Sequence, residues 1–130
     1  SETDPHTHGA DAAYADVPGM TVDITPTATT SKILYMFNCS SAVYGSALTT
    51  WVQVLRDATQ IQYAERFCGY NTVSDWNPYP IVIHGVDSPS TTSAITYKIQ
   101  AKRSGGNYFT FHDHGNASNR QSSIAIEIGV

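Results

Sequence analysis

The chain has 130 residues, which is the length of one ordinary domain, so we expect a single hydrophobic core. Seven Lys and Arg against eleven Asp and Glu give a net charge of −4, which offers no basic surface to a nucleic acid. No apolar run approaches the roughly 18 residues of a membrane-spanning segment, so we expect no membrane insertion. Only 14% of the residues are charged, where about 25% is usual, and the polar remainder favours turns and strands.

The first 16 residues are polar and small and show no sustained period. We therefore expect a polar N-terminal arm over residues 1–16 that the core does not require, and a β-sandwich domain over residues 17–130. A turn at Pro18-Gly19 precedes the first predicted strand, over residues 21–25, in which Val22 and Ile24 alternate with polar neighbours.

The strongest predicted strand runs from Lys32 to Ser40, because both of its alternating faces are largely apolar. One face contains Ile33, Tyr35, Phe37 and Cys39. The other contains Leu34 and Met36. A strand of this kind is central: one face belongs in the core of a sandwich and the other needs a second cover, which a neighbouring subunit could supply.

Six further strands are predicted between clusters of turn residues, over residues 48–56, 60–64, 81–86, 94–102, 107–113 and 123–128. The turn Asp57-Ala58-Thr59 predicts a hairpin between the first two of these. The turn Ser104-Gly105-Gly106-Asn107 predicts a second hairpin, which pairs residues 96–102 with residues 108–111.

Side-chain alternation is most regular in residues 94–102. It places Tyr97, Ile99 and Ala101 inward and the intervening polar residues outward, since a shift by one residue would bury the lysines. No segment of ten residues has a helical period. The sequence therefore predicts an all-β fold, an antiparallel β-sandwich that is jelly-roll-like, with about seven to nine short strands.

Two cysteines give little information about the redox compartment. Cys39 lies in an apolar strand and Cys68 beside a glycine in a predicted loop, without the spacing of a metal site. Buried thiols are the favoured interpretation, and a disulfide between the two is the alternative.

The sequence contains none of the local motifs of hydrolases, kinases or zinc peptidases, and its acidic residues are scattered singly. We therefore expect a protein that binds or assembles, with no enzymatic activity and no catalytic residues.

His112 and His114 lie at the end of a predicted strand run and share one of its faces, because residues two apart on a strand point the same way. Three copies around a threefold axis would present six imidazoles, a ligand set that suits a transition metal. No other cofactor is indicated. His6 and His8 repeat the spacing in the arm. The alternative for both pairs is a solvent-facing or hydrogen-bonded histidine, and His84 is interpreted as a structural residue at a strand end.

The segment from Phe67 to Pro80 is a predicted long loop in which aromatic rings alternate with amide and carboxylate groups. Aromatic rings stack on sugar faces and polar groups bind sugar hydroxyls, so the loop is a candidate glycan site. Its candidate residues are Tyr70, Asn71, Asp75, Trp76, Asn77 and Tyr79. The alternative is that Trp76 and Tyr79 pack on the core or between subunits.

Several segments together resemble a module of tail-fibre and other virion proteins of tailed bacteriophages, many of them marine. They are residues 18–26 (PGMTVDITP), 30–34 (TSKIL), 87–93 (DSPSTTS), 96–100 (TYKIQ) and 122–128 (SSIAIEI). The resemblance covers about Val17 to the end of the chain. It implies a virion-associated β-sandwich similar to the trimeric tumour-necrosis-factor-like jelly rolls, located on the particle.

From this resemblance we expect a trimeric tail-fibre or virion-surface domain that binds a host-surface receptor, in particular a glycan. Two alternatives remain. One is an architectural subunit, for capsid decoration or filament formation, whose arm contacts other virion proteins. The other is a secreted carbohydrate-binding module, which would act as a monomer.

Overall fold

The computed structural model describes residues 6–8, 11–44, 49–65, 76–104, 108–111 and 121–129. In these ranges the chain forms strands and no helix. The strands are β1 (His6–His8), β2 (Asp11–Ile24), β3 (Lys32–Tyr44), β4 (Thr49–Arg56), β5 (Thr59–Glu65), β6 (Trp76–Asp87), β7 (Ile95–Ser104), β8 (Tyr108–Phe111) and β9 (Ser122–Ile128). The same ranges therefore contain no helix with the length and apolarity needed to cross a membrane.

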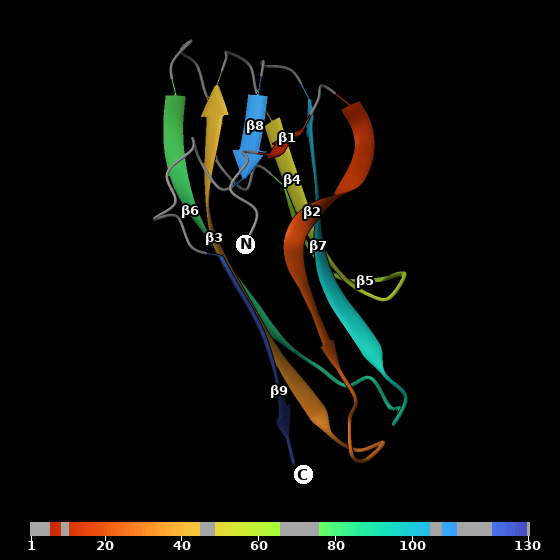
Figure 1. The fold of residues 1–130 in the computed structure, drawn as a ribbon. Coiled ribbons are helices and arrows are strands. Elements are labelled where there is room, and N and C mark those ends of the chain that lie inside the picture. Colours follow the sequence, from red (N-terminus) through yellow and green to blue (C-terminus); the bar gives the residue numbers. More distant parts are fainter. Residues whose placement is uncertain are drawn as a thin grey trace.

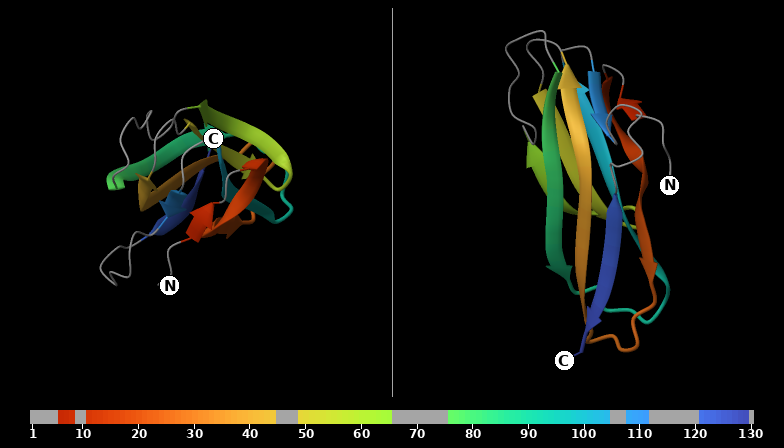
Figure 2. Two further views of the ribbon diagram at one scale, coloured as in Figure 1. Left: turned by 90° about the horizontal axis from the view of Figure 1, so that it is seen from above. Right: turned by 60° about the vertical axis from the view of Figure 1, so that its left-hand side comes forward.

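The strands form two antiparallel sheets that face each other (Figure 1). In sheet A, β3 is central and β6 runs along one side of it. On the other side of β3, β8 lies beside its C-terminal part and β9 beside its N-terminal part, and β1 extends the sheet beyond β8. Sheet B has the order β2-β7-β4-β5. The predicted all-β antiparallel sandwich is confirmed, and Figure 2 shows that it is longer along its strands than across its sheets.

The core lies between the sheets and consists of alternate residues of the long strands. Of the two predicted faces of β3, the structure buries the one with Ile33, Tyr35, Phe37 and Cys39, and the predicted inward face of β7 is also buried. These core residues are Ile33, Tyr35, Phe37, Cys39, Tyr97, Ile99 and Ala101. Phe109 and Phe111 of β8 close one end of the core, with ring centroids 4.6 Å apart.

The predicted hairpin at residues 57–59 is confirmed, because β4 and β5 pair directly across it. Asp57 has a φ of 51°, which a tight reversal requires and which Asp tolerates better than most residues. Its backbone N–H donates to the carbonyl oxygen of Thr96 at 2.7 Å, and its carboxylate accepts from the N–H of Thr96 at 2.9 Å. The turn is thereby attached to β7.

The second predicted hairpin is wrong. β7 belongs to sheet B, where β2 and β4 occupy both of its edges, whereas β8 belongs to sheet A and pairs with β3 and β1. The glycine-rich segment 104–107 thus joins strands of different sheets. A turn signal indicates a reversal of direction, but it does not determine which sheet the next strand joins.

Strand structure begins earlier than the sequence indicated. Residues 6–8 of the predicted arm form β1, and β2 begins at Asp11 rather than near Val17. The predicted turn at Pro18-Gly19 lies inside β2, where the pairing with β7 shifts register between Asp16 and Thr21. Gly19 has a φ of 72°, so the turn residues produce a bulge instead of ending the strand.

β6 also begins earlier, at Trp76, and includes Pro78 and Pro80. Proline lacks the N–H that a central strand must donate, but β6 is an edge strand and has one side without a pairing strand among the described residues. The last part of the predicted loop is therefore strand.

Candidate functional site

The predicted site residues fall into two groups. Tyr70, Asn71, Asp75, His112 and His114 lie outside the described residues, as does Cys68. Trp76 and Asn77 open β6, opposite Tyr44 and Val43 of β3. Tyr79 is partly buried against the hydrophobic core. Where the chain is described, no group of three or more His, Cys, Asp or Glu could hold a metal ion.

The outer side of sheet A is an exposed apolar surface, which we call the apolar face. It consists of Leu34, Met36, Val82, Val86, Ile124, Ile126 and Ile128. Six of these side chains are 40–58% exposed, and Leu34 is partly buried. Among the described residues, the other large hydrophobic side chain with comparable exposure is Tyr63, on sheet B. The outward side of β3 is thus the one with Leu34 and Met36, and its two neighbouring strands widen it.

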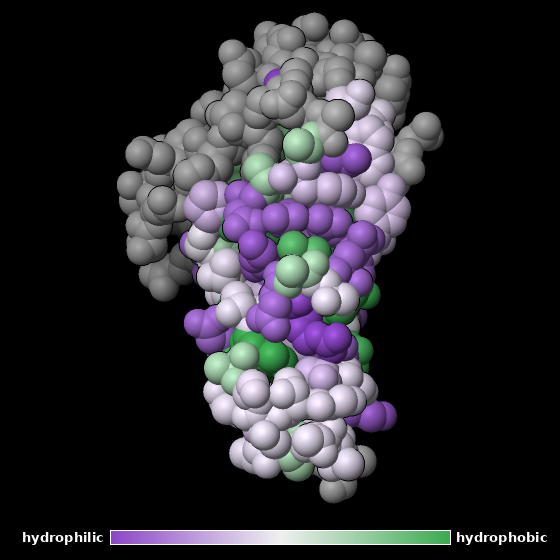
Figure 3. All heavy atoms as spheres, turned by 90° about the vertical axis from the view of Figure 1, so that its right-hand side faces the viewer, coloured by the Kyte–Doolittle hydropathy of each residue, from purple (hydrophilic) through white to green (hydrophobic). Residues whose placement is uncertain are grey.

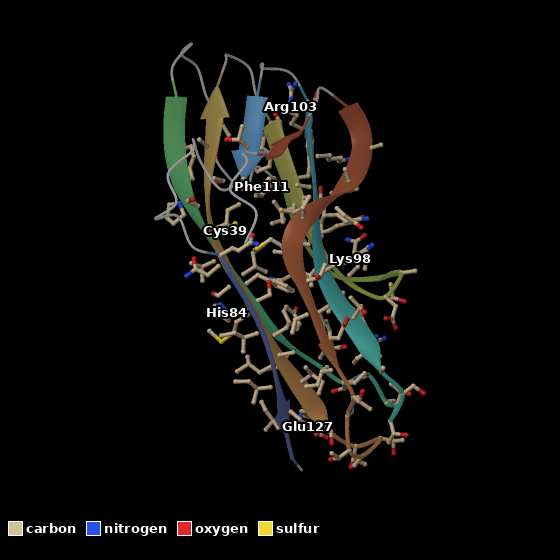
Figure 4. The ribbon with its side chains drawn as sticks, in the orientation of Figure 1. Cys39, His84, Lys98, Arg103, Phe111 and Glu127 are labelled. Carbon is tan, nitrogen blue, oxygen red and sulfur yellow. The ribbon has the colours of Figure 1, made fainter. Side chains whose placement is uncertain are left out.

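The strand register brings the apolar face into cross-strand rows. Val86, Leu34 and Ile126 form one row across β6, β3 and β9, and the next row contains His84, Met36 and Ile124. Neighbours in a row have Cβ atoms roughly 5 Å apart, so their side chains form one continuous surface. His84 is an exposed member of this surface in the middle of β6, not a strand-end residue as predicted (Figure 4).

β9 contributes its isoleucines to this surface because its opposite side meets the sandwich edge near β2. Ala125 packs partly against the core, and the carboxylate of Glu127 accepts hydrogen bonds from the N–H and hydroxyl of Thr27 at 2.7 and 2.8 Å. Hydrogen bonds from Ser31 and Thr27 hold the pKa of Glu127 below its ordinary value. These contacts orient β9 with Ile124, Ile126 and Ile128 outward.

The outer side of sheet B is polar and its groups bind one another (Figure 3). Gln53 Nε2 donates to Gln100 Oε1 at 2.7 Å, and Gln100 Nε2 donates to Asp16 Oδ1 at 2.6 Å. Lys98 Nζ lies 2.9 Å from Asp16 Oδ2. Hydrogen bonds from Gln100 and then Lys98 lower the pKa of Asp16. This side of the sandwich presents hydrogen-bonded polar groups, whereas the apolar face presents hydrophobic side chains.

An aromatic and cationic cluster lies on the same polar side. Lys102 Nζ is 4.7 Å from the ring centroid of Tyr14 and 4.9 Å from that of Trp51, both within the range of cation–π attraction. Trp51 and Lys102 are direct cross-strand partners on β4 and β7. The cluster joins β2, β7 and β4.

A polar network links the two sheets inside the sandwich. Arg56 Nη1 of β4 donates to both carboxylate oxygens of Asp87 at the end of β6, at 3.0 and 2.8 Å. The hydroxyl of Tyr97 donates to the same carboxylate at 2.8 Å. Tyr35 stacks on Tyr97 with centroids 5.4 Å apart, and its hydroxyl donates to Gln62 at 3.0 Å. The network fixes β6 and β3 against sheet B.

Stability at alkaline pH depends on this network. Burial, and then the hydrogen bond to Asp87, raise the pKa of Tyr97 above its ordinary value of about 10, and burial also raises the pKa of Tyr35. A raised pKa in the folded state leaves stability intact below pH 10 and reduces it as the pH rises further. We expect Tyr97→Phe to reduce this decline by up to about 1.4 kcal/mol per pH unit. Urea unfolding between pH 9 and pH 11 measures the difference, and equal slopes would contradict it.

The two long sides of the sandwich differ. On one side β9 lies beside β2, and Ser123 Oγ donates to the carbonyl of Gly19 at 3.4 Å. On the other side, a cavity of about 240 Å³ opens between β4, β5 and β6. Its lining residues are Val52, Val54, Gln62, Ala64, Val82, Ile83 and His84. The free edge of β6 therefore borders an open, largely apolar groove.

The sequence predictions missed the contributions of β6 and β9 to the apolar face. The signal was present, because Ile124, Ile126 and Ile128 alternate with small and polar residues. That alternation identifies two faces of a strand without showing which one is outward. The usual preference of large apolar side chains for the protein interior would have placed the isoleucines in the core.

Comparison with known proteins gives a likeness at the level of fold. No family model matches the chain, and no curated protein matches it. Among solved structures, it is similar to a chain in the structure of infectious bursal disease virus, Gt strain, with a TM-score of 0.50 and 12% sequence identity. The match covers 95% of this chain and 30% of the viral chain, so this chain spans less than a third of its relative's length. At this identity, the likeness shows a shared β-sandwich fold.

Proposed function

We propose that this chain is a structural domain of a virus particle that associates with copies of itself through the apolar face. The observation that carries the proposal is the exposure of six large apolar side chains on three adjacent strands. Soluble monomers rarely expose a contiguous apolar patch of more than a few hundred Å². The similar fold in a virus structure and the segments that resemble phage virion proteins support a place in a virion.

The magnitude of the apolar contribution favours contact between two such faces. Burying each half-exposed side chain contributes about 1 kcal/mol, so one face contributes roughly 6 kcal/mol. Losing the free motion of two molecules costs about 4–15 kcal/mol. If one apolar face contacts a polar partner, its contribution of roughly 6 kcal/mol is smaller than most of the values in that range. The faces of two copies contribute roughly 12 kcal/mol, which is comparable with the cost, and a third copy whose face joins them adds to this sum.

In more detail, we propose a homotrimer on a phage tail fibre or particle surface, with a glycan receptor as its ligand. The glycan site of this proposal contains Tyr70, Asn71, Asp75, Trp76 and Asn77, where aromatic and amide groups are concentrated in the sequence. Tyr79 is a weaker member of this set, since its ring packs partly against the core. His112 and His114 would bind a metal only where a threefold axis joins three copies.

Association through the apolar face predicts that charge placed there abolishes the trimer. We expect the double variant Met36→Lys with Ile126→Lys to sediment as fewer than three chains at micromolar concentration, where the unaltered protein sediments as three or a multiple of three. The matched control is Tyr63→Lys, because Tyr63 is similarly exposed at 49% but lies on sheet B. The control should remain associated, and circular dichroism should show strand structure in every variant.

Sedimentation of the unaltered protein as a monomer at tens of micromolar would contradict the proposed function. A monomer that bound glycans would instead be a carbohydrate-binding module. An association that survived both lysines would show that another surface holds the copies together.

A further inference from the structure

We propose that the free edge of β6 pairs with β6 of a second copy, antiparallel and about a two-fold axis at His84. The proposal rests on the self-association proposed above, but it assigns a second and different contact surface. That surface consists of main-chain groups along a strand edge, whereas the proposed trimer contact consists of side chains on the apolar face. The two surfaces meet at Val82 and Val86, whose side chains belong to the apolar face as well.

Within the described ranges, the outer edge of β6 has no pairing strand. β3 pairs with β6 along one side from Trp76 to Asp87, and no strand in the described part of the chain pairs with the other side. Across the groove lies β5, the edge strand of sheet B, and the 240 Å³ cavity separates the two. The main-chain donors and acceptors on this side of β6 are thus available to a strand that arrives from outside.

Half of this edge lacks the usual protection against pairing. Proline or lysine commonly blocks an exposed edge strand. Pro78 and Pro80 provide this protection in the first half of β6. From Ile81 to Val86 there is neither proline nor a charged carboxylate or lysine, and the carboxylate of Asp87 is held by Arg56. A strand that pairs here meets main-chain groups flanked by apolar side chains.

The unprotected half is complementary to itself, which identifies the partner as a second copy. An antiparallel pair centred on His84 places Val82 of each copy opposite Val86 of the other, on the outer side of the joined sheet. These valines, 58% and 57% exposed, are the most exposed large hydrophobic side chains in the described ranges. On the inner side, Ile83 lies opposite Gly85, where the Tyr35 ring of the same chain occupies the place of a side chain. The pairing joins two A sheets into one.

A cysteine at the symmetry axis tests the pairing. Opposite residues of an antiparallel pair have Cα atoms about 4.5–5.5 Å apart, a separation that a disulfide spans. We expect His84→Cys, with Cys68 replaced by Ser, to form a crosslinked dimer under mild oxidation. The matched control is Val82→Cys in the same background. It is exposed on the same side of β6, but it lies about 13 Å along the strand from its own copy.

Two thiols held in place react at an effective concentration of order millimolar. At about 10 micromolar protein, the crosslink at position 84 should therefore form on the order of a hundredfold faster than at position 82. A second pair of variants tests the register. In the His84→Cys background, Val82→Lys with Val86→Lys places like charges opposite each other and should slow the crosslink. Val82→Lys with Val86→Glu places opposite charges together and should keep the crosslink fast. The crosslink is the readout, because Val82 and Val86 also belong to the apolar face.

The outcomes separate this pairing from the proposed function. Fast crosslinking at position 84 alone, with the lysine–glutamate variant crosslinked faster than the double lysine variant, supports the β6 pair. Equal crosslinking at positions 82 and 84 in a protein that still sediments as three chains overturns the β6 pair and leaves the trimer standing. A monomer without preferential crosslinking overturns both.

Discussion

Replacement of Asp87 by alanine is expected to lower the free energy of unfolding by about 3 kcal/mol. The Asp87 carboxylate accepts hydrogen bonds from Arg56 and Tyr97, which belong to the opposite sheet. Its removal leaves a guanidinium and a buried hydroxyl without their acceptor, and an unsatisfied buried group costs more than a lost hydrogen bond contributes. The side chains of Arg56 and Asp87 are 25% and 14% exposed, so solvent reduces the loss below that of a fully buried pair.

Urea unfolding of the variant measures this loss. The control is Asp87→Asn, which keeps an oxygen acceptor for Tyr97 and should lose less stability. In a double-mutant cycle, Tyr97→Phe should cost less in the Asp87→Ala background than in the unaltered protein, because the two groups act together. A loss below about 1 kcal/mol for Asp87→Ala would show that the network does not hold the sheets.

Replacement of Gly85 by alanine is expected to destabilise the fold by about 3 kcal/mol. A Cβ at position 85 would collide with the hydroxyl and ring of Tyr35, its cross-strand partner on β3. Tyr35 is 4% exposed, and its ring has no space to move without leaving the stack on Tyr97. The strand thus requires glycine because an aromatic ring occupies the place of a side chain.

Thermal and urea unfolding should detect this effect. Val86→Ala, at the next position on the outer side of β6, is the control and should change stability by less than about 1 kcal/mol. Shortening the ring makes room, so Gly85→Ala should cost less in a Tyr35→Leu background than alone. Equal costs in both backgrounds would exclude the collision as the cause.

Local patterns in the sequence correctly identified much of the fold. The faces of β3 and β7 were predictable because alternation within a strand depends on neighbouring residues alone. The β4–β5 hairpin was predictable because a short polar turn joined two apolar runs that pair directly.

The errors share one physical cause, which is that partners distant in sequence decide the outcome. Whether β8 would pair with β7 depended on β2 and β4 occupying both edges of β7. Whether Pro78 and Pro80 would end a strand depended on β6 lying at a sheet edge. The Pro18-Gly19 turn became a bulge because β2 continues its pairing with β7 on both sides of it.

The candidate site was predictable only in part. The two apolar faces of Lys32–Ser40 predicted that one of them needs a second cover, and the structure leaves Met36 of the outer face 40% exposed. The contributions of Val82, Val86 and the β9 isoleucines follow from strand register and from the contacts of Glu127 with Thr27. The glycan and metal predictions involve residues 70–79, 112 and 114 and remain predictions.

The division of one edge of β3 between β8 and β9 has a consequence for the timing of assembly. Lys32 pairs with Ile128 and Asn38 with Ser122. During synthesis, the N-terminal part of β3 therefore lacks this pairing strand until β9 has been made, about 90 residues later. Until residues 122–128 have emerged, one of the three strands that carry the apolar face is missing. A nascent chain is therefore a poor partner for a finished one, and copies are expected to recognise each other only after synthesis of the domain is nearly complete.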